Sequence, residues 1–249
     1  MHRSLALILL WTAAVFAQAP ATPVSPKDRA AFEAIIKDYL LKNPGIIREA
    51  IERLRAMEEA EQAQKVSAAL AQNRASLLND PDSPVAGNPK GDVTVVEFFD
   101  YNCGYCKKVA GSLLDLAARD PNVRIVYKEY PILGPESVEA ARAALVAHKQ
   151  GKYLAFHQAM MTGSGRGAQA IQAALTKAGV DSKQVAKETA DPAIARIIER
   201  NQKLAAALDI QGTPAFIIGD QIVPGALSAD SLAIMVKGER AKAAGQKNP

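Results

Sequence analysis

The chain has 249 residues, of which 49% are hydrophobic and 22% charged, so it can bury a core as one large domain or two smaller ones. Its formal charge of +4 is small, and Lys and Arg are interspersed with Asp and Glu. This pattern argues against a nucleic-acid partner and favours a solvated surface.

The first residues predict an exported protein. Arg3 precedes an apolar run from Leu5 to Phe16, and small residues follow, which is the pattern of a secretory signal peptide. We place the cleavage after Ala17, so that residues 1–17 are removed. The run is short for a bilayer span, which makes an uncleaved anchor the weaker alternative. A protein exported to the periplasm exposes its cysteines to an oxidising compartment.

Residues 18–80 are predicted to form an N-terminal helical region with a linker helix. A first helix (28–41) carries apolar residues on one face, and "KNPG" interrupts it. A second helix begins near Pro44, becomes strongly polar at "EEAEQAQK", and resumes its apolar steps to about residue 78. A helix with so narrow an apolar stripe is not stable by itself and needs a packing partner. We interpret residues 28–78 as an oligomerising stalk, with packing against its own domain as the alternative.

Turn-forming residues at 79–92 mark a boundary, and we assign 81–249 to a second domain. Residues 93–99, "VTVVEFF", predict a buried strand, a helix follows from Cys103, and 123–132 predict the next strand. Strand, helix and strand at this length form a βαβ unit, so the two strands should be parallel.

Residues 135–209 carry only helical signals. "TPAFIIG" and "QIVPGA" then predict a two-stranded hairpin around Gly219-Asp220, and a last helix runs from Ser228 to about residue 243.

The only two cysteines, Cys103 and Cys106, leave several functions open. Structural zinc needs four ligands, and the remaining candidates His148 and His157 are nine residues apart in helical segments, where we expect them at the surface or in the core. Copper(I) takes two thiolates, so a Cu(I) site at Cys103 and Cys106 remains an alternative. A static disulfide across two residues closes too small a loop to stabilise much.

The position of the pair favours a reactive dithiol. Cys103 lies where a strand ends and a helix begins, and the unpaired amides and the helix dipole there favour a thiolate. We expect Cys103 to attack and Cys106, one turn deeper, to resolve. Lys107 and Lys108 either add positive potential near the cysteines or are ordinary solvated residues on the helix surface. Pro214, in "GTP" before the strand "AFIIG", has a cis peptide bond or is an ordinary loop proline.

Together, "FFDYNCGYC", "YKEYPILGPES", "GTPAFIIG" with "VPGA", and "DYLLKNPGIIREAIERLR" resemble the DsbA-like thiol-disulfide oxidoreductases of the thioredoxin superfamily, and most closely their ScsC/Com1-type members. The resemblance implies an α/β thioredoxin fold with a helical domain inserted at about 135–209, preceded by an N-terminal helical stalk. No separate cofactor is expected, because the redox-active Cys103–Cys106 disulfide carries the electrons.

The resemblance also implies roles for single residues. Cys103 and Cys106 match the nucleophilic and resolving cysteines, and Pro214 matches the cis-proline that faces them. Thr213 matches the position whose backbone pairs with an extended substrate. Glu97 matches a buried acid, which would have a raised pKa and pass protons to Cys106; an outward-facing Glu97 is the alternative.

Two features favour disulfide isomerisation or reduction over oxidation. Gly104 and Tyr105, which we expect to contact substrate, replace the Pro-His of strongly oxidising relatives, and they resemble the isomerase dipeptide, as does Thr213. An oligomeric stalk, by resemblance a trimer, would present several sites to one client. The expected partners are misfolded or reduced secreted proteins and a membrane thiol reductase that supplies electrons. A monomeric dithiol oxidase and a copper-tolerance protein are the alternatives.

Overall fold

The computed structural model describes residues 25–245, and the predicted signal peptide lies outside them. The described chain forms two compact units, which divide between Glu58 and Glu59 within helix α2 (Gly45–Gln72). No helix between residues 25 and 245 combines the length and apolar character that a bilayer span requires.

The first unit contains helix α1 (Pro26–Lys42) and the start of α2. Ser25 caps α1, because its Oγ accepts a hydrogen bond from the Asp28 backbone N–H at 3.2 Å. Four apolar side chains spaced three or four residues apart on α1 are each more than half exposed: Phe32, Ile35, Ile36 and Tyr39. The unit therefore presents a continuous apolar face on one side of the helix.

The second unit is built on a five-stranded sheet in the order β1-β3-β2-β4-β5. Strands β2 (Val93–Phe99) and β3 (Val123–Glu129) are parallel, which confirms the predicted βαβ unit. Strands β4 (Ala215–Ile218) and β5 (Gln221–Pro224) form the predicted hairpin, and β4 pairs antiparallel with β2. Strand β1 (Val85–Gly87) pairs antiparallel with β3 and was not predicted.

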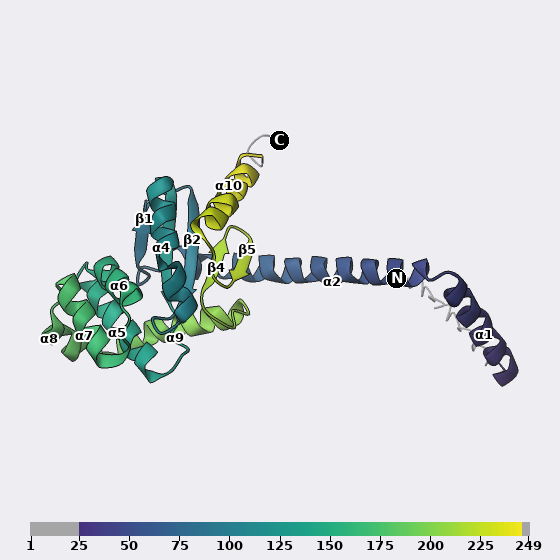
Figure 1. Ribbon diagram of the computed structural model, residues 1–249, viewed down its shortest axis with the longest axis horizontal. Coiled ribbons are helices and arrows are strands. Elements are labelled where there is room, and N and C mark those ends of the chain that lie inside the picture. The colour runs from purple at the N-terminus through teal and green to yellow at the C-terminus, as the bar shows by residue number, and fades with distance from the viewer. Residues whose placement is uncertain (1–24, 246–249) are drawn as a thin grey trace, which may run out of the picture. The chain divides into compact units, whose positions relative to one another are not determined.

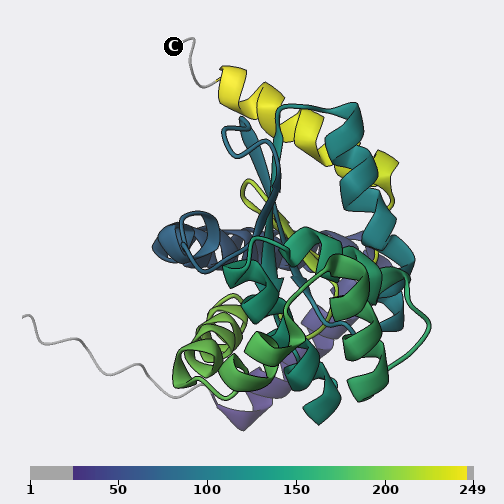
Figure 2. The same ribbon diagram turned by 90° about the vertical axis from the view of Figure 1, so that its left-hand side faces the viewer.

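Side chains alternate between the two faces of this sheet. The first face, with Val95 and Phe99 of β2, is covered by α4 (Gly104–Arg119) and α10 (Ala229–Gly245), which contact one another (Figures 1 and 2). The second face, with Val96 and Phe98, packs against the end of α2 and against two further helices: α3 (Arg74–Leu78) and α9 (Pro192–Ala207). Both faces of β2 are thus buried.

The end of the predicted linker helix differs from the prediction. The helix does not run unbroken to residue 78, because it is interrupted at Asn73, whose side-chain amide donates to Ala69 O at 2.8 Å. Leu70 and Leu77 on either side of the break are buried on the second face of the sheet. These two residues therefore pack against their own domain, and the exposed apolar face lies nearer the N-terminus.

Helices fill the segment between β3 and β4, as predicted for residues 135–209. They begin with α5 (Pro135–Lys149) and continue with α6 (Tyr153–Thr162), α7 (Gly167–Ala178), α8 (Ser182–Glu188) and α9. Helices α5 to α8 gather at one end of the sheet (Figure 1). The breaks coincide with turn formers; Gly179, for example, ends α7 with a φ of 63°.

A buried ion pair ties the segment before β1 to the second face of the sheet. The side chain of Lys128 on β3 is fully buried, and its Nζ donates to Ser76 O at 2.6 Å, Ser83 Oγ at 2.6 Å and Asp80 Oδ2 at 3.1 Å. Burial alone would raise the pKa of Asp80, but the Lys128 ammonium holds it below its usual value. The pair therefore fixes the route by which the chain enters the sheet.

Candidate active site

The two cysteines lie at the N-terminus of α4, the helix that covers the first face of the sheet. Cys103 is the N-cap residue, with φ −76° and ψ 117°, and its Sγ accepts a hydrogen bond from the Cys106 backbone N–H at 3.3 Å. Both are free thiols; Cys103 is 6% exposed and Cys106 is fully buried. The Cys103 sulfur thus occupies the place where unpaired amides and the helix dipole favour a negative charge.

The segment before β4 faces Cys103 from the neighbouring part of the sheet. The Thr213–Pro214 peptide bond is cis, and the Cys103 thiol donates to Thr213 O at 3.2 Å. The Pro214 carbonyl in turn accepts from Gly225 N–H at 2.8 Å. The fold therefore brings Cys103 into contact with Thr213, which lies 110 residues later in the chain and directly before Pro214.

Glu97 lies on β2, on the same face of the sheet as the buried Cys106. It is 2% exposed, so the alternative of an outward-facing Glu97 is wrong. Burial raises the pKa of Glu97 to about 8. Burial also raises the pKa of the Cys106 thiol, and the negative charges of Cys103 and Glu97 raise it further. Cys106 and an acid whose pKa is raised to about 8 therefore share one buried environment.

A second acid, Asp100, holds the loop before Cys103 in place. One of its carboxylate oxygens accepts from Asn102 N–H at 2.7 Å and Ser137 Oγ at 2.8 Å. The other accepts from Ile132 and Leu133 N–H at 2.8 and 3.0 Å. Asp100 thus fixes the cysteine loop to the loop between β3 and α5. This role was not predicted, because three of its four hydrogen-bond partners are more than 30 residues away.

Two cationic side chains connect the helical insertion to α4 and to the loop before Cys103. Lys107 Nζ donates to the carbonyls of Gly163 and Gly165 at 2.9 and 3.2 Å, and Arg166 donates to Asn102 O at 3.2 Å. Lys107 is therefore more than a solvated surface residue. Lys108 instead lies over the ring of Tyr105, 5.3 Å from its centroid, and Tyr105 is 63% exposed.

Comparison with known families now adds to this geometry. Residues 94–237 match the family of the DSBA-like thioredoxin domain, and this stretch contains both cysteines and the cis-proline. The chain belongs to this family. Residues 28–61 match a second family, described as the copper resistance protein ScsC N-terminal domain. The predicted fold, a DsbA-like thioredoxin domain behind an N-terminal helical region, is confirmed.

Solved structures agree with this assignment. A thioredoxin-like oxidoreductase from Silicibacter pomeroyi DSS-3 is 46% identical, with a TM-score of 0.66 over 68% of this chain and 98% of that one. A linker-deletion mutant of Proteus mirabilis ScsC is 31% identical, with a TM-score of 0.67 over 90% of this chain and 100% of that one. The thiol-disulfide exchange protein alpha-DsbA2 from Wolbachia pipientis is 28% identical, with a TM-score of 0.66 over 72% and 97%.

The matching curated relatives are much longer proteins. One of them, a Na(+)/H(+) antiporter NhaA 1 from Salinispora arenicola, is 28% identical over 63% of this chain, but the match spans only 25% of the antiporter. The chain thus spans about a quarter of the length of these relatives, and the family that is shown for it is that of the DSBA-like thioredoxin domain.

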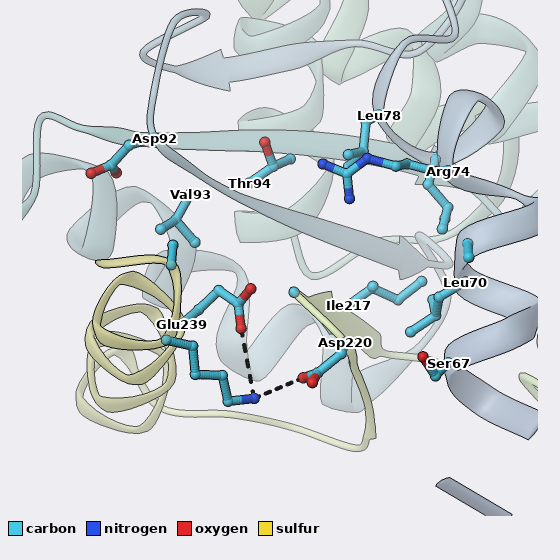
Figure 3. Close-up of a pocket in the computed structure, with 15 residues that line it drawn as sticks. Ser67, Leu70, Arg74, Leu78, Asp92, Val93, Thr94, Ile217, Asp220 and Glu239 are labelled. Carbon is cyan, nitrogen blue, oxygen red and sulfur yellow. Dashed lines mark hydrogen bonds and ion pairs between the residues drawn. The ribbon is translucent and has the colours of Figure 1, made fainter. Parts of the chain in front are cut away.

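A pocket of about 380 Å³ lies away from the thiols of this DsbA-like domain (Figure 3). It is lined by Val93 and Thr94 at the start of β2, by the Asp220 turn, and by residues of α2, α3 and α10. Cys103 follows the opposite end of β2, and a strand of seven residues is about 20 Å long. The pocket is therefore separate from the cysteine pair.

Proposed function

We propose that the chain is an exported protein disulfide isomerase or reductase that acts through the Cys103-Gly104-Tyr105-Cys106 site. The observation that carries this proposal is the place of the Cys103 sulfur, within 3.3 Å of the Cys106 amide and 3.2 Å of the Thr213 carbonyl. The amide favours the attacking thiolate, and the Thr213 backbone lies where an extended substrate segment would pair with it.

The exchange follows from these positions. The Cys103 thiolate attacks one sulfur of a substrate disulfide, forms a mixed disulfide and releases the other substrate sulfur as a thiolate. A thiolate of the substrate then displaces Cys103 and completes an isomerisation. If the substrate is trapped, Cys106 attacks Cys103 and releases the reduced substrate, while Glu97 takes the proton from Cys106. The resulting Cys103–Cys106 disulfide needs two electrons from a partner, for which we propose a membrane thiol reductase.

The exposed apolar face of α1 supports isomerisation over oxidation. Phe32, Ile35, Ile36 and Tyr39 are 57–64% exposed, and a face of this kind is stabilised by association with further copies. We propose a homo-oligomer, with a trimer as the ScsC-like form, assembled through α1 and the start of α2. Several exchange sites would then meet one misfolded secreted client at high effective concentration. Residues 1–17, as a signal peptide, would direct the protein to the periplasm.

Refolding of scrambled ribonuclease tests the proposal. The protein should restore ribonuclease activity in a glutathione buffer, and Cys103→Ala should not. A protein that rapidly oxidises reduced ribonuclease but leaves the scrambled form inactive would be the alternative dithiol oxidase.

The oligomer is tested with substitutions on opposite sides of α1. Ile36→Glu should reduce the mass measured by light scattering to that of one chain and lower isomerase activity. Ala34→Glu introduces the same charge on the other side of the helix and should leave both unchanged. Deleting residues up to about 80 is unsuitable, because it would remove the buried Leu70 and Leu77.

Copper binding is the second candidate. Cys103 and Cys106 are free thiols joined by one N–H···S contact, and two thiolates suit Cu(I). The description of the N-terminal family, a copper resistance protein, also favours it. Stoichiometric Cu(I) uptake that competes with a strong chelator, in a protein without exchange activity, would make metal binding the main function.

A further inference from the structure

A chain of buried hydrogen bonds lies beside the cysteine loop and takes no part in the exchange steps above. Its members are Tyr101, Glu129, Tyr153 and His157, all at most 5% exposed. Buried polar groups of this kind cost stability unless each finds a partner, so their presence in a core needs a reason.

The four side chains satisfy one another. Tyr153 donates its hydroxyl hydrogen to Glu129 Oε1 at 2.8 Å, and Tyr101 Oη lies 3.2 Å from the same oxygen. Tyr101 Oη also lies 3.3 Å from His157 Nδ1, so the tyrosine joins the acid to the imidazole. Burial raises the pKa of Glu129 well above its usual value, although the two tyrosine hydroxyls lower it. The network therefore forms one continuous polar cluster.

Its members come from three parts of the fold. Tyr101 lies in the loop after β2, two residues before Cys103, and Glu129 is the last residue of β3. Tyr153 and His157 belong to α6 of the helical insertion. The ring of Phe99 packs against Tyr101 and His157, with centroids 5.0 and 4.9 Å away. The hydrogen bonds thus connect the segment that carries the nucleophile directly to the insertion.

We propose that this network is a positioning device that stabilises the dithiol form of the site relative to the disulfide form. In the structure both thiols are free, and Cys103 Sγ forms hydrogen bonds with the Cys106 amide and with Thr213 O. Asp100 anchors the loop before Cys103 to the segment after β3, and Tyr101 adds a second anchor that connects the loop to the helical insertion. In the disulfide form the Cys103–Cys106 bond fixes the same segment covalently, so the network adds less there. This inference rests on the proposed exchange function.

Redox equilibrium with glutathione tests the network. The reaction converts the dithiol and one oxidised glutathione into the protein disulfide and two reduced glutathiones, so its constant compares the two forms. Tyr101→Phe removes the hydroxyl that contacts both Glu129 and His157, and it should shift the constant toward the disulfide form by about fivefold or more, since one net hydrogen bond is worth about fivefold. Tyr153→Phe should shift it in the same direction. The double variant should shift it by less than the product of the two, because both hydroxyls meet at Glu129 Oε1.

Urea unfolding of both redox forms separates positioning from plain stability. The reduced form of each variant should lose more stability than the oxidised form. Tyr130→Phe is the matched control: its hydroxyl donates to Ile210 O at 3.1 Å and its ring packs on Phe98 on the other face of the sheet, so the equilibrium should not move.

Equal losses in the two forms, with an unchanged glutathione constant, would overturn the inference. A wild-type protein that does not equilibrate with glutathione at all would instead overturn the proposed function. If Tyr101→Phe does not fold, Tyr153→Phe, on α6 and outside the cysteine loop, tests the same connection.

Discussion

Replacing Glu97 by Gln should make the protein more stable at neutral pH. Glu97 is buried beneath α4, and its pKa is raised from 4.5 to about 8. The folded state therefore holds the proton more tightly than the unfolded state does. Its stabilising effect is complete below pH 4.5 and is lost as the pH rises toward 8, because the unfolded chain ionises first.

The size of the effect follows from the two pKa values. Each pKa unit corresponds to about 1.4 kcal/mol. The free energy of unfolding of the wild type should therefore fall by that amount per pH unit relative to Glu97→Gln. Between pH 4.5 and pH 7 the difference grows to about 3 kcal/mol. The replacement of a carboxyl by an amide also changes the free energy of unfolding by an amount that does not depend on pH. This amount leaves the slope against pH unchanged.

Urea unfolding of the reduced proteins between pH 4.5 and 8 measures the slope. Glu33→Gln, at an exposed position on α1, is the control and should stay within about 0.5 kcal/mol of wild type over this range. Parallel stability curves for wild type and Glu97→Gln would refute a buried acid that ionises near pH 8. The same variant should release trapped substrate about 100-fold more slowly if Glu97 accepts the Cys106 proton.

Two further predictions concern the second cysteine and the buried lysine. Cys106→Ala should accumulate a mixed disulfide with substrate, visible as a band shift on a non-reducing gel, whereas Cys103→Ala should form none. Lys128→Met should cost about 3 kcal/mol in urea unfolding, because Asp80 keeps its burial and loses its cation. Lys149→Met removes two solvent-accessible ion pairs, with Glu188 and Asp191, and should change stability by about 0.5 kcal/mol or less. Equal losses in both variants would contradict the importance of the buried pair.

The order of elements in the catalytic unit was largely predictable, because its signals are local. Strands β2 and β3 are apolar runs, and the helical insertion breaks at glycines and turn formers. Strand β1 was missed because its three residues lie within a turn-forming segment and owe their extended form to pairing with β3. The break at Asn73 also escaped prediction, since the apolar steps continue across it at Leu70 and Leu77.

Site residues that belong to a short sequence motif were predictable. Those whose partners are distant in the sequence were not. Cys103, Cys106 and the Thr213–Pro214 bond belong to recognisable short patterns. The hydrogen bonds of Glu129 to Tyr101 and Tyr153 span 28 and 24 residues, and Tyr101 reaches His157 across 56. The one sequence signal for Glu129 was a charged residue at the end of an apolar strand.

The two faces of the sheet explain why the cysteines would differ in role. Lys128, the buried cation, lies on the second face, where it is paired with Asp80. Glu97 and Glu129 lie on the first face with Cys106, and among residues 25–245 neither acid forms an ion pair. Negative charge is therefore costly there, which raises the pKa of Cys106 and of both acids. Cys103, at the helix start on the edge of that face, is the thiol whose sulfur accepts a hydrogen bond from a backbone amide, that of Cys106. The proposed roles, an attacking Cys103 and a proton-retaining Cys106, therefore match the end of the helix and the face of the sheet at which each lies.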